Sequence, residues 1–198
     1  MECKVIRQCP ICGWDKGKII RRIQMVRYKI PISTEYNIVK CLNCGFCYAD
    51  VEENQQQYNL YYKNYNMYSA STKLKETIIS QMCEVRYEVF EKYVTKDSKI
   101  LDIGCGDGTF LRYLKDRGYS NIYGIDPSEK SIYCLKEKGI DGEVGNIFDE
   151  VSEKLRNKYD VVTCTAVLEH INDLKSAMAQ IDLYLQPQDG KIFIEVPA

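Results

Sequence analysis

Residues 100–111, ILDIGCGDGTFL, carry the clearest structural signal in this chain. It opens with a short β-prone run, ILDI, and apolar residues recur at helical spacing over residues 109–117. The stretch therefore predicts a strand, a tight turn and a helix. The turn contains three glycines, Gly104, Gly106 and Gly108. Glycine permits a positive φ and lets a ligand approach bare backbone amides, and the helix start offers unpaired N–H groups to an anion.

Strand-like and helix-like segments alternate from residue 99 onward. After the first strand and helix, we predict strands near residues 121–126, 141–145, 159–166 and 190–197, with helices over 127–139 and 174–185. This alternation predicts an α/β fold with a mostly parallel, doubly wound, Rossmann-like sheet. Ligands of such sheets bind at the carboxyl ends of the strands.

The glycine spacing matches neither common phosphate-binding loop. A dinucleotide site has the spacing GxGxxG, whereas the glycines here are spaced GxGxG. A Walker loop ends in GK[ST], and no lysine follows Gly108. Asp126 stands at the tip of the second predicted strand, 22 residues beyond Gly104 (126 − 104 = 22). A carboxylate at that place can accept hydrogen bonds from both hydroxyls of a ribose.

Length and composition limit the class of protein. A chain of 198 residues with 45% hydrophobic content can bury one full core and a small satellite domain. It has no run of the roughly 18–20 apolar residues that a membrane span requires, and its N-terminus lacks the apolar core of a secretory signal. We therefore expect a cytoplasmic protein that has no membrane partner.

Charge is distributed unevenly along the chain. Residues 1–50 carry nine Lys/Arg and four Asp/Glu (9 − 4 = +5), and residues 51–198 carry 18 and 24 (18 − 24 = −6), which sum to −1. The acidic remainder argues against a dedicated nucleic-acid binder, although a local basic face could still meet phosphates.

Four of the ten cysteines form two CxxC pairs near the N-terminus. The pairs read CPICG at residues 9–13 and CLNCG at residues 41–45, and each offers two thiolates from a tight turn that is followed by glycine. Strand-like residues 18–32 and 36–41 could form a ribbon across the gap. We predict a structural, tetrahedral zinc site whose ligands are Cys9, Cys12, Cys41 and Cys44.

Other interpretations of these cysteines stay open. Cys47 adds a further CxxC step and could replace a neighbouring ligand, and Cys3 is also near. An iron–sulfur centre and buried reduced thiols are alternatives to zinc. A shell of four sulfurs leaves no open coordination position, so we expect no catalytic role for the metal.

The segment between the cysteine-rich part and the alternating part is polar and rich in tyrosine. Tyrosine rings bury area, so we expect it to fold onto a neighbouring surface. Residues 73–94 follow as a helix with an apolar stripe that we expect to pack on the next domain: Ile78, Ile79, Met82, Val85 and Val89. The predicted parts are a zinc-binding ribbon (1–50), a tyrosine-rich bridge (51–72) and a ligand-binding domain (73–198).

Four motifs in order resemble those of the class I S-adenosylmethionine-dependent methyltransferases, namely LDIGCGDGTFL (101–111), GIDPS (124–128), GNIFD (145–149) and YDVVTCTAVLEHINDL (159–174). The resemblance covers residues 99–198 and implies S-adenosylmethionine as the cofactor. It implies that the glycine loop faces the methionine and ribose, that Asp126 holds the ribose hydroxyls and that the GNIFD motif reads the adenine edge. The implied cofactor-binding residues are Asp102, Gly104, Cys105, Gly106, Asp126, Pro127, Asn146, Ile147 and Thr165.

With the cysteine pairs included, the chain resembles the zinc-containing methyltransferases of deoxysugar and polysaccharide biosynthesis, among them sugar C-methyltransferases. This resemblance implies a small-molecule acceptor such as a nucleotide-linked sugar, and Tyr65 or Tyr68 as a lid over the cofactor. Members of that group continue past the fifth strand, where a further segment supplies the proposed base. The chain has no sequence for the last two strands of the usual core, so it could be a C-terminally truncated fragment.

The candidate catalytic residues are His170 and Glu169, which follow the fourth predicted strand and could deprotonate the acceptor. A histidine at a helix start more often caps or packs. If the base lies beyond Ala198, the polypeptide would bind cofactor without activity. A zinc-ribbon RNA base methyltransferase is the alternative enzyme. Four basic residues between the cysteine pairs could contact RNA or the diphosphate of a nucleotide, and a solvated face of the ribbon is the other interpretation: Arg21, Arg22, Arg27 and Lys29.

Overall fold

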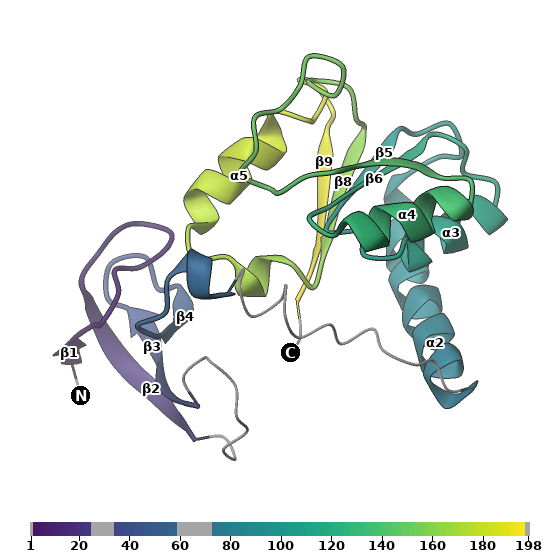
Figure 1. Ribbon diagram of the computed structural model, residues 1–198. Helices are drawn as coiled ribbons and strands as arrows, with labels where there is room; N and C mark the ends of the chain where they lie inside the picture. Colours follow the sequence, from purple (N-terminus) through teal and green to yellow (C-terminus); the bar gives the residue numbers. More distant parts are fainter. Residues whose placement is uncertain (1, 25–33, 59–72, 197–198) are drawn as a thin grey trace. The chain divides into compact units, whose positions relative to one another are not determined.

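A computed structural model describes residues 2–24, 34–58 and 73–196 of the chain (Figure 1). The chain divides into two compact units. The first unit comprises Met1–Met67 together with His170–Lys175, and the second comprises Tyr68–Glu169 together with Ser176–Ala198. A six-residue segment that follows the fourth predicted strand of the alternating part therefore groups with the N-terminal unit.

The second unit contains a five-stranded sheet in which every strand pair is parallel (Figure 1). Its strands are β5 (Ile100–Ile103), β6 (Ile122–Asp126), β7 (Asp141–Val144), β8 (Val161–Thr165) and β9 (Lys191–Glu195). Their spatial order is β7-β6-β5-β8-β9, so the chain runs outward from β5 to one edge and then returns to the other. The predicted α/β fold with a parallel, doubly wound sheet is confirmed.

Helices connect and cover these strands. They are α2 (Lys73–Phe90), α3 (Thr109–Asp116), α4 (Glu129–Glu137) and α5 (Leu174–Asp182), with 3₁₀ turns at Glu91–Tyr93 and Leu168–His170. Local chemistry sets several ends: the Ser128 hydroxyl accepts from the Ser131 N–H at 3.2 Å at the start of α4. Gly118 and Gly139, shortly after α3 and α4, have φ of 89° and 66°, the left-handed conformation that ends helices.

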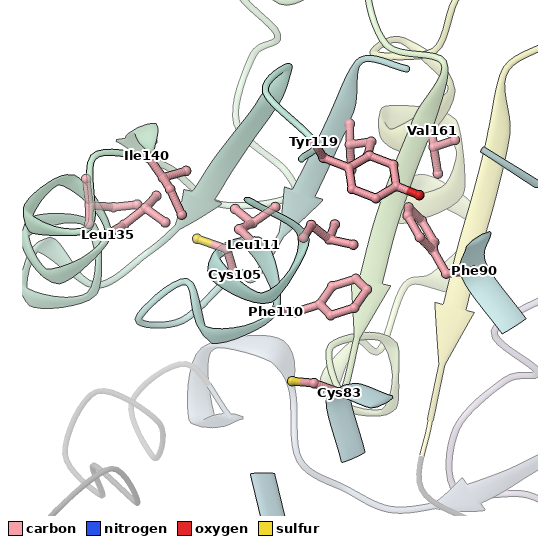
Figure 2. Close-up of a cluster of buried hydrophobic side chains, with 12 residues drawn as sticks. Cys83, Phe90, Cys105, Phe110, Leu111, Tyr119, Leu135, Ile140 and Val161 are labelled. Carbon is pink, nitrogen blue, oxygen red and sulfur yellow. The ribbon is translucent and has the colours of Figure 1, made fainter. Parts of the chain in front are cut away.

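The main core lies between the sheet and the three helices α2, α3 and α4. Figure 2 shows its buried side chains, which come from both the strands and the helices. The Phe90 ring makes edge contacts with Phe110 and Phe193, with ring centroids 5.7 and 5.5 Å apart. Each fully buried large apolar side chain contributes about 1.5–3 kcal/mol of transfer free energy, so this aromatic cluster fixes α2 against β9 and α3.

The prediction that the apolar stripe of α2 packs on this core is wrong. Ile79, Met82, Val85 and Val89 are 43%, 53%, 64% and 47% exposed. The face that packs instead carries Cys83 and Phe90, which are 3% and 1% exposed. The helix has apolar residues on two faces, and the face with the larger aromatic ring is the one that fills the core. The side chain of Ile78 lies outside the described residues.

The first unit contains a four-stranded antiparallel sheet in the order β1-β2-β3-β4. Its strands are β1 (Glu2–Lys4), β2 (Lys16–Gln24), β3 (Glu35–Cys41) and β4 (Cys47–Asp50). The predicted ribbon corresponds to β2 and β3, and β1 and β4 extend it on both sides. One face of the sheet packs into a small core of Val5, Cys9, Val39, Cys41 and Tyr48. Within the described residues, no helix is long and apolar enough to cross a membrane.

Candidate functional site

The glycine-rich turn of the second unit joins the carboxyl end of β5 to the start of α3. Gly104, Gly106 and Gly108 have φ values of 74°, 55° and 76°, which side chains with a Cβ rarely adopt. A Cβ on Gly104 would lie 2.4 Å from Val167 Cγ2, and one on Gly108 would lie 2.2 Å from Leu135 Cδ1. The turn therefore needs glycine both for its backbone conformation and for close packing.

Asp126, at the carboxyl end of β6, lies against this turn. Its Oδ2 accepts a hydrogen bond from the Gly106 N–H at 2.8 Å, and its Oδ1 accepts from the Ser128 N–H at 2.9 Å. The side chain is 8% exposed. Each carboxylate oxygen keeps a further lone pair, so the group is oriented and can still accept from a ligand. The two features that the sequence analysis singled out are thus in direct contact.

Asp102 is the most enclosed carboxyl group of the site. It is 1% exposed, and its Oδ1 accepts a hydrogen bond from the Thr163 hydroxyl at 2.6 Å. Burial raises the pKa of Asp102 to about 6, although Thr163 and Arg86 favour the ionised form. Asp102 therefore lies close to its titration point near neutral pH.

Arg86 of α2 and Glu195 at the end of β9 form an ion pair beside Asp102 that the sequence analysis did not find. Arg86 Nε and Nη2 donate to Glu195 Oε2 and Oε1 at 2.9 and 2.7 Å. The guanidinium also lies 4.9 Å from the Phe110 ring centroid, in the first turn of α3. The local signal for this ion pair in the sequence was an arginine on an otherwise apolar face of α2.

Lys138, at the end of α4, forms two hydrogen bonds with Asp107 of the glycine-rich turn. Its Nζ donates to the Asp107 carbonyl at 2.6 Å and to Asp107 Oδ2 at 3.0 Å. Asp107 Oδ1 accepts from the backbone N–H and the hydroxyl of Thr109. Burial alone would raise the pKa of Asp107, but these hydrogen bonds and the Lys138 charge lower it below its ordinary value. This contact was also missed, because the two residues are 31 positions apart.

The other residues implied in cofactor binding lie at the ends of neighbouring strands. The Gly145 N–H donates to the Asp126 carbonyl at 3.1 Å, which brings the segment after β7 next to β6. Asn146 is held in a turn, since its N–H donates to Asp149 Oδ2 at 2.7 Å. The remaining positions are the buried residues Cys105 and Ile147, the exposed Pro127 and the half-buried Thr165 at the end of β8.

The two candidate bases belong to different units. Glu169 belongs to the second unit, where partial burial and then the charge of Glu195 raise its pKa above the ordinary value. His170 belongs to the first unit, where burial lowers its pKa and its carbonyl accepts a hydrogen bond from Gln55 Nε2 at 3.0 Å. Tyr65 and Tyr68, the candidate lid residues, lie outside the described residues, as do Arg27 and Lys29.

The segment 170–175 is tied into the first unit by Asn172. Arg7 Nη1 donates to Asn172 Oδ1 at 2.9 Å, and Asn172 donates from its backbone N–H to Gln55 Oε1 and from Nδ2 to the Glu53 carbonyl. A cavity of about 460 Å³ borders this network and is lined in part by Ile6, Arg7, Val51 and Asn172. Sequence reasoning did not find it, because Arg7 and Asn172 are 165 positions apart.

The four predicted metal ligands converge in the first unit. The Sγ atoms of Cys9, Cys12, Cys41 and Cys44 all lie within 4.8 Å of one another, with two pairs 3.6 Å apart. A tetrahedron with Zn–S bonds of about 2.3 Å requires sulfur–sulfur separations of about 3.8 Å, so the cluster fits zinc. Gly13 and Gly45 have φ of 73° and 78°, as expected for turns that follow each pair.

Comparison with known proteins identifies the family of the second unit. The family described as "Methyltransferase domain" matches residues 74–198. Ubiquinone biosynthesis O-methyltransferase of Pseudomonas aeruginosa (strain UCBPP-PA14) is 32% identical over 101 residues, which cover 48% of this chain and 43% of that protein. The chain therefore spans less than half the length of this curated relative.

Solved structures share the fold. The PH0226 protein from Pyrococcus horikoshii OT3 aligns with a TM-score of 0.55 at 23% identity, over 68% of this chain and 64% of that one. Coclaurine N-methyltransferase bound to N-methylheliamine and SAH aligns with a TM-score of 0.52 at 20% identity, over 64% and 38%. The chain belongs to the methyltransferase domain family, and its parallel sheet has the fold of the class I S-adenosylmethionine-dependent methyltransferases.

Proposed function

We propose that the second unit binds S-adenosylmethionine at the carboxyl ends of β5, β6 and β7 and transfers its methyl group to a small-molecule acceptor. The observation that carries this proposal is the 2.8 Å hydrogen bond from the Gly106 N–H to Asp126 Oδ2. It joins a loop of bare backbone to an oriented carboxylate, which together suit the amino-acid and ribose parts of an adenosyl amino acid.

The residues around this contact fit the cofactor. The Asp126 carboxylate accepts from the ribose hydroxyls, and the turn at Asn146 and Ile147 borders the adenine edge. The backbone at Thr165 would accept from the methionine ammonium, and the Asp102 carboxylate would contribute negative charge near that group. Pro127 is exposed beside Asp126, whereas the Cys105 side chain packs in the core, so only the backbone of Cys105 would face the cofactor. When bound, the cofactor supplies an activated sulfonium methyl group for in-line displacement.

Glu169 and His170 are the two residues proposed to accept a proton from the acceptor. Glu169 has a raised pKa, so its carboxylate is a stronger base than that of an ordinary glutamate. His170 has a lowered pKa and is neutral at pH 7, so it is able to accept a proton. These two are the candidate general bases.

We further propose a nucleotide-linked sugar as the acceptor and a structural zinc ion in the first unit. The cysteine cluster supports the zinc, and the combination of such a cluster with this domain is the feature that resembles the sugar methyltransferases. The relatives that are named for ubiquinone biosynthesis support a small-molecule acceptor in general.

The cofactor proposal is tested by isothermal titration with S-adenosylhomocysteine. Wild type should bind, and Asp126→Ala should bind at least tenfold more weakly because a charged hydrogen-bond acceptor contributes about 1.5–3 kcal/mol. Asp189→Ala is the matched control, since Asp189 is an exposed carboxylate in the same unit. Equal affinity in wild type and Asp126→Ala would contradict the assignment. A screen of acceptors with labelled methyl donor then tests the sugar nucleotide against phenolic and RNA acceptors.

A further inference from the structure

The sheet of the first unit has two chemically different faces. The strand register pairs Lys18 with Lys40 and Lys4 with Lys16, and a β-bulge between Ile19 and Arg21 returns Arg21 to the same face. Paired residues and alternate residues along a strand share a face. The cationic face therefore consists of Lys4, Lys16, Lys18, Arg21 and Lys40, all of which are exposed. The opposite face packs into the core around Val39.

This arrangement is electrostatically unfavourable for the sheet alone. Like charges directly opposite each other on neighbouring strands are destabilising, and here two lysine pairs are directly opposed. Among the side chains that the structure describes, which exclude that of Glu2, none forms an ion pair with these five cationic groups. In register, the backbone of Glu2 lies opposite Lys18. A four-thiolate zinc centre would carry a formal charge of about −2, which would offset only part of the positive charge of the five cationic side chains.

The extent of the cationic face distinguishes a polymer from a small anion. Three strands spaced about 4.8 Å apart span about 10 Å across the sheet. From Lys16 to Arg21 the face extends about 13 Å along β2, because one of the five steps is absorbed by the bulge and each of the others spans about 3.3 Å. A single diphosphate would contact only one corner of such a grid, whereas a chain of phosphates can reach every cation.

We propose that the cationic face binds single-stranded nucleic acid. Tyr36 and Ile38 continue the same face along β3 and are half-buried, and the ring of Tyr36 offers an aromatic surface on which a base can stack. Single-stranded nucleic acid is bound by this combination of a positive track with stacking surfaces. A bilayer surface would instead need exposed apolar side chains that can insert, whereas Tyr36 and Ile38 on this face are half-buried. The net charge of −1 does not reveal the cationic face, because the strand register gathers positive charge on one face of the sheet in the first unit.

This inference concerns docking on the first unit and is independent of which acceptor is methylated. It is tested with the full chain by fluorescence anisotropy of a labelled oligouridine of about 15 nucleotides, titrated at salt concentrations from about 50 to 300 mM. Five phosphate contacts predict that log K falls against log salt with a slope of about −3.5, at about −0.7 for each contact on a single strand.

The variant Lys18→Gln/Lys40→Gln removes two of these contacts, so the slope should fall to about −2.1. The matched control Lys130→Gln/Lys136→Gln removes the same charge from exposed positions of α4 in the second unit and should leave the slope unchanged. Zinc content and Trp14 fluorescence show whether the first unit is intact in each variant.

Three results would overturn the proposal. One is a wild-type slope near zero or no binding at the lowest salt concentration. Another is an equal loss in the Lys130→Gln/Lys136→Gln control. The third is tighter binding to a duplex of the same length, or to phosphatidylserine vesicles, than to the single strand.

Discussion

Replacing Arg86 with methionine tests how α2 is held at the carboxyl ends of the sheet. Arg86 binds both carboxylate oxygens of Glu195, at 2.9 and 2.7 Å, and lies over the Phe110 ring. Methionine keeps the apolar stem and removes the charge and both hydrogen bonds. The decrease in the stability of the second unit should therefore reflect loss of the ion pair more than loss of packing.

The magnitude follows from the exposure of the two partners. A hydrogen bond to a charged group contributes about 1.5–3 kcal/mol in favourable cases. The Arg86 side chain is 11% exposed, so its desolvation offsets part of this gain. The Glu195 side chain is 37% exposed, so water screens the pair. We expect a net loss of about 1.5 kcal/mol in the free energy of unfolding of the second unit, or about 3–6 °C in Tm.

The effect should depend on pH. The hydrogen bond from Arg86 lowers the pKa of Glu195 below its ordinary value of 4.5. A carboxylate whose folded-state pKa is depressed stabilises the fold above its unfolded pKa, and this contribution is lost as pH falls through the folded pKa. The difference between wild type and Arg86→Met should be complete near neutral pH and shrink below about pH 4.5.

Far-UV circular dichroism during thermal unfolding measures this difference, because the second unit contains α2, α3, α4 and most of α5. Arg112→Met is the control, since Arg112 is paired with Asp116 at 3.8 Å and both side chains are 62% exposed. An exposed pair of this kind contributes less than about 0.5 kcal/mol. Equal Tm values for the two variants, or a difference from wild type that persists undiminished at about pH 3, would show that the ion pair does not stabilise the second unit in this way.

Three further outcomes are expected. Gly104→Ala should destabilise the second unit by at least about 1–3 kcal/mol and weaken S-adenosylhomocysteine binding in calorimetry, because its φ is 74° and a Cβ would meet Val167 at 2.4 Å. Burial raises the pKa of Asp102 to about 6, so wild type should lose stability as pH rises from about 4 to about 6 and this carboxyl group ionises. Asp102→Asn should remove that loss. An unchanged dependence of Tm on pH in circular dichroism would count against this prediction. Chelation should release about one zinc per chain and change Trp14 fluorescence while the helical signal of the second unit persists, and Cys41→Ser should contain no zinc by metal analysis.

Much of the site could be anticipated because its signals are local. The positive φ at Gly104, Gly106 and Gly108 follows from a turn that must pass directly from a strand into a helix, and glycine adopts it without strain. Asp126 follows a strand-like run, so its place at a strand tip was predictable. The two CxxCG pairs likewise carry their own turn geometry. The contacts of Arg86 with Glu195 and of Arg7 with Asn172 join residues 109 and 165 positions apart, and no local pattern encodes them.

The parallel α/β architecture, the glycine-rich turn, the place of Asp126 at a strand tip and the two cysteine pairs could all be predicted from the sequence, since each is marked by its own short run of consecutive residues. Which face of α2 is buried depends on tertiary packing, because the helix has two apolar stripes and the core accommodates Phe90 and leaves Val85 exposed. The tertiary structure likewise decided which cations gather on the first unit. Strand register places Lys18 against Lys40, and register depends on the pairing of whole strands and not on any single residue.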